Sequence, residues 1–152
     1  MRFFIIIITL ALGLVACSGE PTTQSNTQPK AETKHAAQSV SEDARIAAVL
    51  TYADWCTSCK ILDPKLKAVR AGAPIDGVDY LVIDYTDRNK ADFFAQAEAA
   101  GVGPAMHARF DEEIFTGLLV LVDLDTGAVV GEIKKSMSEA EIRTTLEQAV
   151  AA

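Results

Sequence analysis

Two cysteines in the segment Trp55-Cys56-Thr57-Ser58-Cys59-Lys60 are the residues best suited to chemistry. On a helix, residues i and i+3 share one face with Cβ atoms about 5–6 Å apart, so small movements bring two such sulfurs within bonding distance. If the helix begins near Cys56, unpaired backbone N–H groups and the helix dipole stabilise its thiolate, and Lys60 adds positive charge nearby. The expected chemistry is reversible thiol–disulfide exchange, with Cys56 attacking and Cys59 resolving.

The pattern around this pair predicts a strand that leads into it and a helix that follows. Residues 45–52 are mostly apolar and predict a buried strand, and residues 59–71 carry apolar side chains at helical spacing. Further on, the pattern predicts a strand over 78–85, with an apolar run dense enough for a central position, and then a helix over 89–100. The dithiol therefore lies where a strand passes into a helix.

The C-terminal part adds a hairpin and a last helix. Strands over 118–124 and 128–134 flank the turn Asp125-Thr126-Gly127, and Ser138-Glu139-Ala140-Glu141 resembles a capping box that opens a helix to about Val150. Strands separated by helices pair in parallel, whereas the hairpin adds an antiparallel edge. We therefore expect an α/β fold in the order β-α-β-α-β-β-α, with a mixed sheet and helices on both faces.

The first residues have the composition of an export signal. One basic residue and an apolar run of about a dozen residues precede Leu14-Val15-Ala16-Cys17. The run is short of the roughly 20 residues of a transmembrane helix, although an uncleaved anchor remains the alternative. The four residues also resemble the lipobox of bacterial lipoproteins, in which the cysteine is acylated. We expect a signal peptide over 1–16, a lipidated cysteine and flexible linker over 17–39, and a domain over 40–152.

The segment from Tyr52 to Pro64 resembles the active site of thioredoxin-fold proteins. It is most similar to the periplasmic reductant-transferring kind, such as the C-terminal domain of DsbD, and the resemblance covers about residues 40–150. This resemblance implies a thioredoxin-like three-layer sandwich in which Cys56 is the nucleophile and Cys59 the resolving thiol. Trp55 would be the aromatic residue that packs beside them.

Composition and resemblance together limit the partners. The net charge of −7 and the lack of a Lys/Arg cluster argue against nucleic acid. No glycine-rich phosphate loop, serine nucleophile elbow or histidine ligand cluster is present, so we expect neither an organic cofactor nor a metal site. The expected partners are disulfide-containing exported proteins, a membrane electron donor or acceptor, and the membrane itself through a lipid anchor that faces the periplasm.

Two positions depart from the thioredoxin pattern. The buried carboxylate that serves the resolving thiol in many thioredoxins is replaced by Leu50, and Asp54 is the only nearby acid in the sequence. The family's cis-proline strand entry aligns with Thr116-Gly117. Since a cis bond at a non-proline residue costs about 2.5–4 kcal/mol, we expect Gly117 to be trans. In the family that proline shapes the substrate groove and shields the dithiol from metal, so we expect an altered substrate preference.

Residues 101–115 show no clear period and are longer than the family's usual link at this point. They form either a lid over the dithiol or an uninvolved surface excursion. His107 within them is either a third ligand for Cu(I) beside the two thiolates or an ordinary histidine. Copper binding or delivery through Cys56 and Cys59 therefore stays open, as does a redox-inert interaction module. A static disulfide is disfavoured, because so short a loop restricts the unfolded chain very little.

Overall fold

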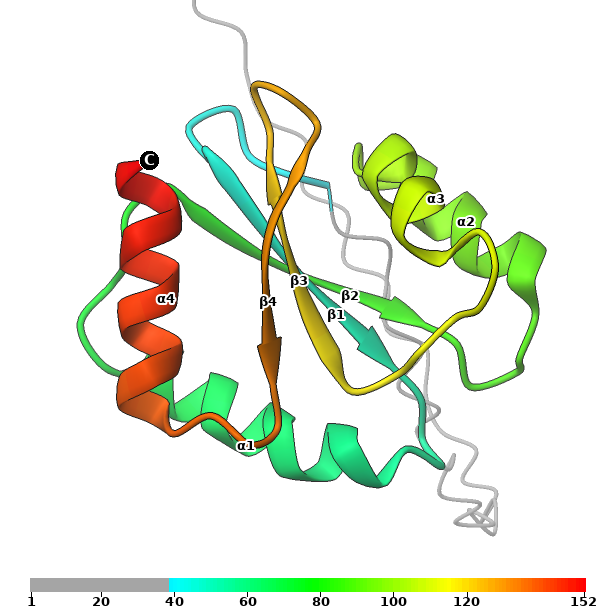
Figure 1. Ribbon diagram of the computed structural model, residues 1–152, viewed down its shortest axis with the longest axis horizontal. Helices are drawn as coiled ribbons and strands as arrows, with labels where there is room; N and C mark the ends of the chain where they lie inside the picture. Colours follow the sequence, from blue (N-terminus) through cyan, green and yellow to red (C-terminus); the bar gives the residue numbers. More distant parts are fainter. Residues whose placement is uncertain (1–38) are drawn as a thin grey trace, which may run out of the picture. The chain divides into compact units, whose positions relative to one another are not determined.

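A four-stranded mixed sheet forms the centre of the computed structural model, which describes residues 39–152. The elements in chain order are β1 (Ile46–Tyr52), α1 (Thr57–Ala71), β2 (Val78–Asp84), α2 (Lys90–Ala99), α3 (Gly103–Phe110), β3 (Leu118–Asp123), β4 (Val129–Lys134) and α4 (Glu139–Ala151) (Figure 1). The strand order is β2-β1-β3-β4; β1 is parallel to β2 and antiparallel to β3, which is antiparallel to β4. The predicted signal peptide, Cys17 and nearly all of the predicted linker lie outside the described residues.

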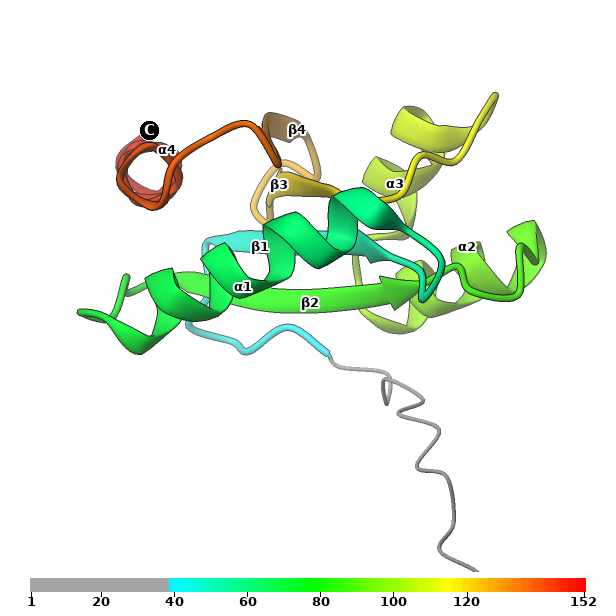
Figure 2. The same cartoon turned by 90° about the horizontal axis from the view of Figure 1, so that it is seen from below.

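Helices cover both faces of this sheet, as predicted. Side chains of alternate strand residues point to opposite faces, so each face builds its own core. Ala47, Val49 and Val120 pack with residues of α2 and α3, whereas Ala48 and Leu119 pack with residues of α1 and α4. Figures 1 and 2 show α1 and α4 on one side of the sheet and α2 and α3 on the other. The predicted α/β, thioredoxin-like three-layer sandwich is confirmed.

The predicted central position of the strand over 78–85 is wrong, because β2 is an edge strand. Leu81 and Ile83 are buried towards α2 and α3, while Val78, Tyr80 and Val82 are partly buried against the core under α1 and α4. The apolar run thus reflects helices on both faces of the strand and not neighbouring strands on both of its edges. β1 and β3 occupy the centre, because the hairpin of β3 and β4 docks on the free edge of β1.

The predicted order lacks one helix, since residues 103–110 form α3. Met106 and Phe110 of this helix are completely buried, and the Phe110 ring meets that of Phe93 in α2 edge to face, with 5.8 Å between centroids. The helix is therefore part of the core, and neither a lid nor a surface excursion describes it. The sequence pattern missed it because it has only eight residues and its N-cap residue, Val102, makes no side-chain capping bond.

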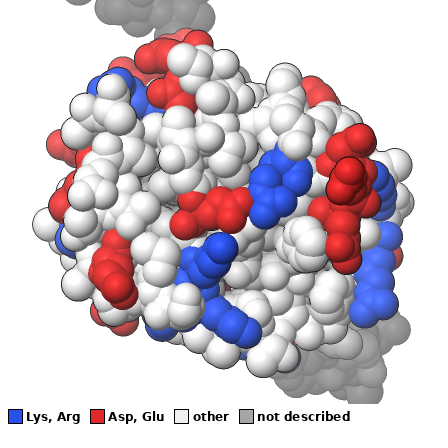
Figure 3. All heavy atoms as spheres, in the orientation of Figure 1, with Lys and Arg blue, Asp and Glu red and all other residues white. Residues whose placement is uncertain are grey.

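The described surface carries charges of both signs. On the face drawn in Figure 3, acidic and basic side chains alternate, with no large region of one sign. Among residues 39–152, every helix is too short or too polar to cross a lipid bilayer.

Candidate active site

The Cys56–Cys59 disulfide lies at the first turn of α1. Cys56 is the N-cap residue, one position before the helix starts at Thr57, and the two Cα atoms are 5.3 Å apart. The Cys56 sulfur accepts a hydrogen bond from the backbone N–H of Cys59 at 3.0 Å. In the reduced protein, this N–H and the positive end of the helix dipole would stabilise a Cys56 thiolate. The helix begins at Thr57, so the start near Cys56 on which the predicted chemistry depends is confirmed.

The two cysteines differ in accessibility in the order that the predicted roles require. Cys56 is 5% exposed and Cys59 is fully buried. Only Cys56 is therefore accessible to a partner, and its small exposed fraction means that the partner must fit closely around it. Trp55, directly before it, is 44% exposed and forms part of the surface that such a partner would touch.

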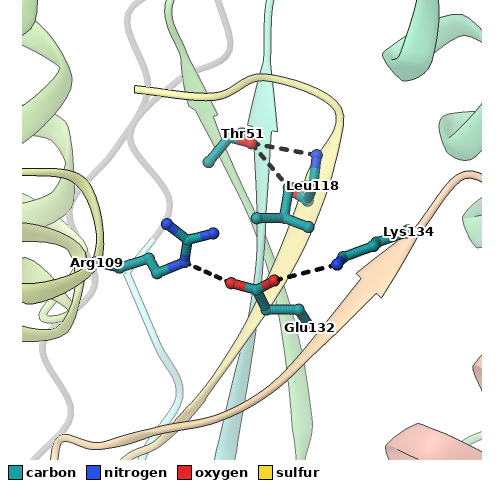
Figure 4. A network of polar contacts seen from close by, with 5 residues as sticks. All are labelled: Thr51, Arg109, Leu118, Glu132 and Lys134. Atoms are coloured by element: carbon teal, nitrogen blue, oxygen red, sulfur yellow. Dashed lines mark hydrogen bonds and ion pairs between the residues drawn. The ribbon is translucent and has the colours of Figure 1, made fainter. Parts of the chain in front are cut away.

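Thr51, the penultimate residue of β1, connects the dithiol to the start of β3. Its buried hydroxyl donates to the Leu118 carbonyl at 3.0 Å and accepts from the Leu118 N–H at 3.3 Å (Figure 4). Its carbonyl accepts the N–H of Gly117 at 2.7 Å, and the Cys59 sulfur lies 3.6 Å from the same oxygen. The carbonyl is therefore an acceptor for the Cys59 thiol once the disulfide is reduced. Sequence reasoning missed Thr51 because it appears as one more residue of a buried strand.

Gly117 lies against the start of α1, as its alignment with the family's proline suggests. No peptide bond in residues 39–152 is cis, which confirms the expected trans bond. Gly117 has φ +78°, and a Cβ at this position would lie 2.3 Å from Cβ of Ser58 and 3.0 Å from the Cys59 nitrogen. Only glycine fits this backbone conformation and this close approach without strain. Thr116, the residue before it, is half-buried.

The structure places Leu50 and Asp54 in different environments. Leu50 is 4% exposed within the apolar core under α1, so it leaves the resolving thiol without a buried acid at this position. Asp54 is exposed and its carboxylate accepts a hydrogen bond from the Tyr52 hydroxyl at 3.1 Å. Desolvation and then this hydrogen bond raise the pKa of Tyr52 above its ordinary value. Tyr52 packs against the Cys56–Cys59 cluster, so its ring connects the Asp54 carboxylate to the surroundings of the dithiol.

A loop that sequence reasoning missed holds the segment before the dithiol. The Trp55 indole N–H donates to the Thr86 carbonyl at 2.9 Å, and the Asp54 backbone N–H donates to the Thr86 hydroxyl at 3.1 Å. Thr86 is fixed in turn by Asp84, whose carboxylate accepts both its N–H and its hydroxyl, at 2.8 and 2.5 Å. The predicted parallel strands could have pointed to this loop. It follows β2, the dithiol follows β1, and the carboxyl ends of parallel strands lie at the same end of a sheet.

The remaining predicted residue, Lys60, is exposed on the first turns of α1. A further residue of this end of the molecule is Phe115, which is 48% exposed and lies two positions before Gly117. Trp55 and Phe115 are thus large apolar side chains left open to solvent near the dithiol. Such exposed apolar surface is typical of protein interaction sites.

His107 does not belong to the dithiol site. It lies on α3, where its ring stacks on Phe94 of α2 with 3.9 Å between centroids and its Nε2 lies 3.5 Å from the Glu98 carboxylate. Within residues 39–152, no group of three or more His, Cys, Asp or Glu side chains could hold a metal ion. Of the two alternatives for His107, the structure therefore supports the ordinary histidine and not the third copper ligand, because the segment that carries it folded into the α2–α3 layer.

Neither a protein-family model nor a curated protein matches this chain. Three solved structures resemble it: Trxlp from Edwardsiella tarda EIB202 (19% identity, 68% of this chain and 82% of that one, TM-score 0.47), Fasciola hepatica thioredoxin (19%, 70% and 83%, 0.45) and StoA from Bacillus subtilis (14%, 67% and 82%, 0.47). Since these TM-scores lie below 0.5, we base the function on the geometry of the chain itself.

Proposed function

We propose that this protein is a thiol–disulfide oxidoreductase that reduces disulfides of partner proteins through Cys56 and Cys59. The observation that carries the proposal is the Cys56 sulfur at the N-cap of α1, bonded to Cys59 and accepting its N–H. This arrangement stabilises a thiolate, and a stabilised thiolate both attacks disulfides and leaves them readily. The completely buried Cys59 is reached by Cys56 alone, which suits a resolving thiol.

The reaction follows from these positions. In the reduced protein, the Cys56 thiolate attacks one sulfur of a partner's disulfide; the mixed disulfide forms as the partner's own S–S bond breaks. Cys59 then loses its proton and attacks the Cys56 sulfur, which forms the Cys56–Cys59 disulfide and releases the second partner thiolate. Two electrons pass to the partner, and its two thiolates take their protons from Cys59 and from water. A dithiol electron donor must then reduce the protein again.

The sequence supports a location for this exchange. The signal-like residues 1–16 and the lipobox-like cysteine at 17 favour an exported protein that is lipid-anchored to a bacterial membrane and faces the periplasm. Its substrates would then be exported proteins, and its electron donor would be a membrane protein, as in the DsbD-like proteins that it resembles. We expect Cys17→Ser to abolish incorporation of labelled palmitate and release the protein from the membrane fraction; unchanged labelling would contradict the lipid anchor.

A redox titration of the full chain in detergent tests the activity. Trp55 is the chain's single tryptophan and precedes Cys56, so its fluorescence reports the state of the dithiol. In glutathione buffers of known potential, we expect one two-electron transition near the thioredoxin value of about −270 mV. A transition near about −120 mV would instead indicate an oxidant such as DsbA. The absence of any transition would contradict the proposed function.

Two cysteine variants check the assigned roles. Cys56→Ser should abolish exchange with any partner, because the accessible nucleophile is lost. Cys59→Ser should retain the first attack and accumulate a mixed disulfide, since the resolving step is lost, and non-reducing electrophoresis would detect that species. Equal trapping by both variants would contradict the assignment of attacking and resolving thiols.

A further inference from the structure

Arg88 lies beside the dithiol although it is distant from it in the sequence. Its guanidinium stacks over the Trp55 ring, with Cζ 4.5 Å from the centroid. The indole is itself fixed by its hydrogen bond to Thr86, in the same loop as Arg88. Since Trp55 directly precedes Cys56 in the chain, the stacked cation lies over the residue next to the reactive cysteine.

The backbone at Arg88 is unusual. It has φ +55°, which makes it the one non-glycine residue with positive φ among residues 39–152. Its N–H donates to the Tyr85 carbonyl at 3.0 Å, which closes a tight turn after β2. Such conformations persist where the surrounding structure imposes them, and they cluster at functional sites. The turn directs a long cationic side chain onto the one tryptophan of the chain.

The charge of Arg88 is not neutralised within the described part of the protein. Arg109 and Arg143 pair with Glu132 and Glu147, whereas no ion pair in residues 39–152 includes Arg88. Stacking uses only the face of the guanidinium, so the N–H groups in its plane remain available for a carboxylate. The acids of this region do not take this role: Asp54 accepts the Tyr52 hydroxyl, Asp84 accepts the Thr86 N–H and hydroxyl, and no ion pair among residues 39–152 joins Arg88 to either of them or to Asp87.

We propose that Arg88, held on Trp55, selects partners with an Asp or Glu close to the disulfide that Cys56 attacks. This inference rests on the proposed exchange activity and names the class of substrate. A partner that forms a mixed disulfide with Cys56 comes close to Trp55, the exposed residue directly before that cysteine. A carboxylate near the partner's cysteine then meets the planar donors of Arg88 in a two-bond pairing, whereas a Lys at the same position meets a like charge.

Two synthetic peptides test this selection. Each is closed by one disulfide, and they differ only in a Glu or a Lys beside the first cysteine. Single-turnover rates are measured with the full chain after reduction by dithiothreitol and removal of the reductant. We expect the Glu peptide to react about tenfold faster than the Lys peptide at low ionic strength, and this ratio to shrink in about 0.5 M salt. Arg88→Gln should bring the ratio close to one, and Arg88→Glu should invert it.

Arg70→Gln is the matched control. Arg70 also stacks on an aromatic ring, with Cζ 4.9 Å from the Tyr80 centroid, but it lies in the last turn of α1, away from the dithiol. This variant should keep the parent's ratio. An equal loss of rate for both peptides in Arg88→Gln would overturn the proposal, because a structural role of Arg88 would not discriminate between them. A ratio near one in the parent would also overturn it, and no reaction with either peptide would overturn the proposed exchange activity itself.

Discussion

Phe110 and Phe115 lie five positions apart in one segment, yet they belong to two different parts of the molecule. Phe110 ends α3 and is completely buried among the aromatic rings of the α2–α3 layer, whereas Phe115 is 48% exposed near the dithiol. Their residue type is the same, so the difference comes from what the fold places around each. The comparison shows that the segment 101–117 divides in two: its helix completes the core, and its last residues run along the surface to Gly117, which lies against Ser58 of α1.

The same contrast separates the polar contacts of these two parts. On the α3 side, Arg109 pairs with Glu132 of β4, and Lys134 approaches the other oxygen of the same carboxylate (Figure 4). At the dithiol, Arg88 and Lys60 form no ion pair with any described carboxylate. Paired charges join α3 to the sheet, whereas unpaired charges near Cys56 remain available to a partner.

The largest expected effect comes from removing the buried ring. Phe110→Ala should lower the free energy of unfolding by about 3–5 kcal/mol, because it leaves a cavity in the core. Phe115→Ala, the matched variant, should change it by less than about 0.5 kcal/mol, as is usual for surface substitutions. It should instead reduce the rate of exchange with protein partners. Urea unfolding followed by circular dichroism measures the free energy of unfolding, and insulin reduction measures the exchange rate. Equal destabilisation by the two variants would contradict the assignment of Phe110 to the core and Phe115 to the surface.

A smaller effect is expected at the close approach between β3 and α1. Gly117→Ala should cost about 2–4 kcal/mol, since it combines a positive φ with a contact that the Ser58 and Cys59 backbone must yield to. Gly127→Ala is the control, because Gly127 has φ +69° but nothing lies within 4 Å of its added Cβ. It should cost only about 1 kcal/mol and leave the redox potential unchanged. Equal costs would show that Gly117 is not pressed against the dithiol helix.

The smallest expected effect lies at α4, remote from both regions. The Ser138 N–H and then its hydroxyl, both donated to the Glu141 carboxylate, lower the pKa of Glu141 below its ordinary value of 4.5. A lowered folded pKa stabilises the protein above the unfolded value, and this stabilisation is lost as the pH falls through the folded value. Ser138→Ala should therefore be less stable than the parent at pH 7, with a gap that narrows on acidification. Urea midpoints of the parent and of Ser138→Ala, measured at pH 7 and again at acidic pH, test this expectation. A difference in stability that widens at acidic pH would contradict it.

Much of the candidate site was predictable because it is local. The i, i+3 spacing of Cys56 and Cys59 and the helix that starts between them follow from neighbouring residues, and the structure confirms both. The capping box at Ser138 and Glu141 is confirmed for the same reason. Gly117 was found through its family alignment, and its trans bond follows from the high energy of the cis form.

Except for the missed helix α3, which is short and lacks a capping side chain, the features that the sequence did not reveal concern neighbours that are distant in the sequence. Whether β2 is central or at an edge depends on where the later hairpin docks, and no pattern within 78–85 contains that information. His107 stacks on Phe94 because α3 packs against α2, which its own eight residues do not reveal. Thr86 and Arg88 reach Trp55 only because the parallel pairing of β1 and β2 brings their carboxyl ends together.

The amino-acid sequence by itself determined the chemistry of this protein: two thiols at a helix start, within a chain that alternates strands and helices. The backbone N–H groups and the dipole that act on Cys56 come from its own helix, so they need no distant partner. Only the tertiary structure decided which side chains surround that chemistry. The sheet brought the loop after β2 and the entry to β3 to the end of β1, and side chains far apart in the sequence meet only where strands pair.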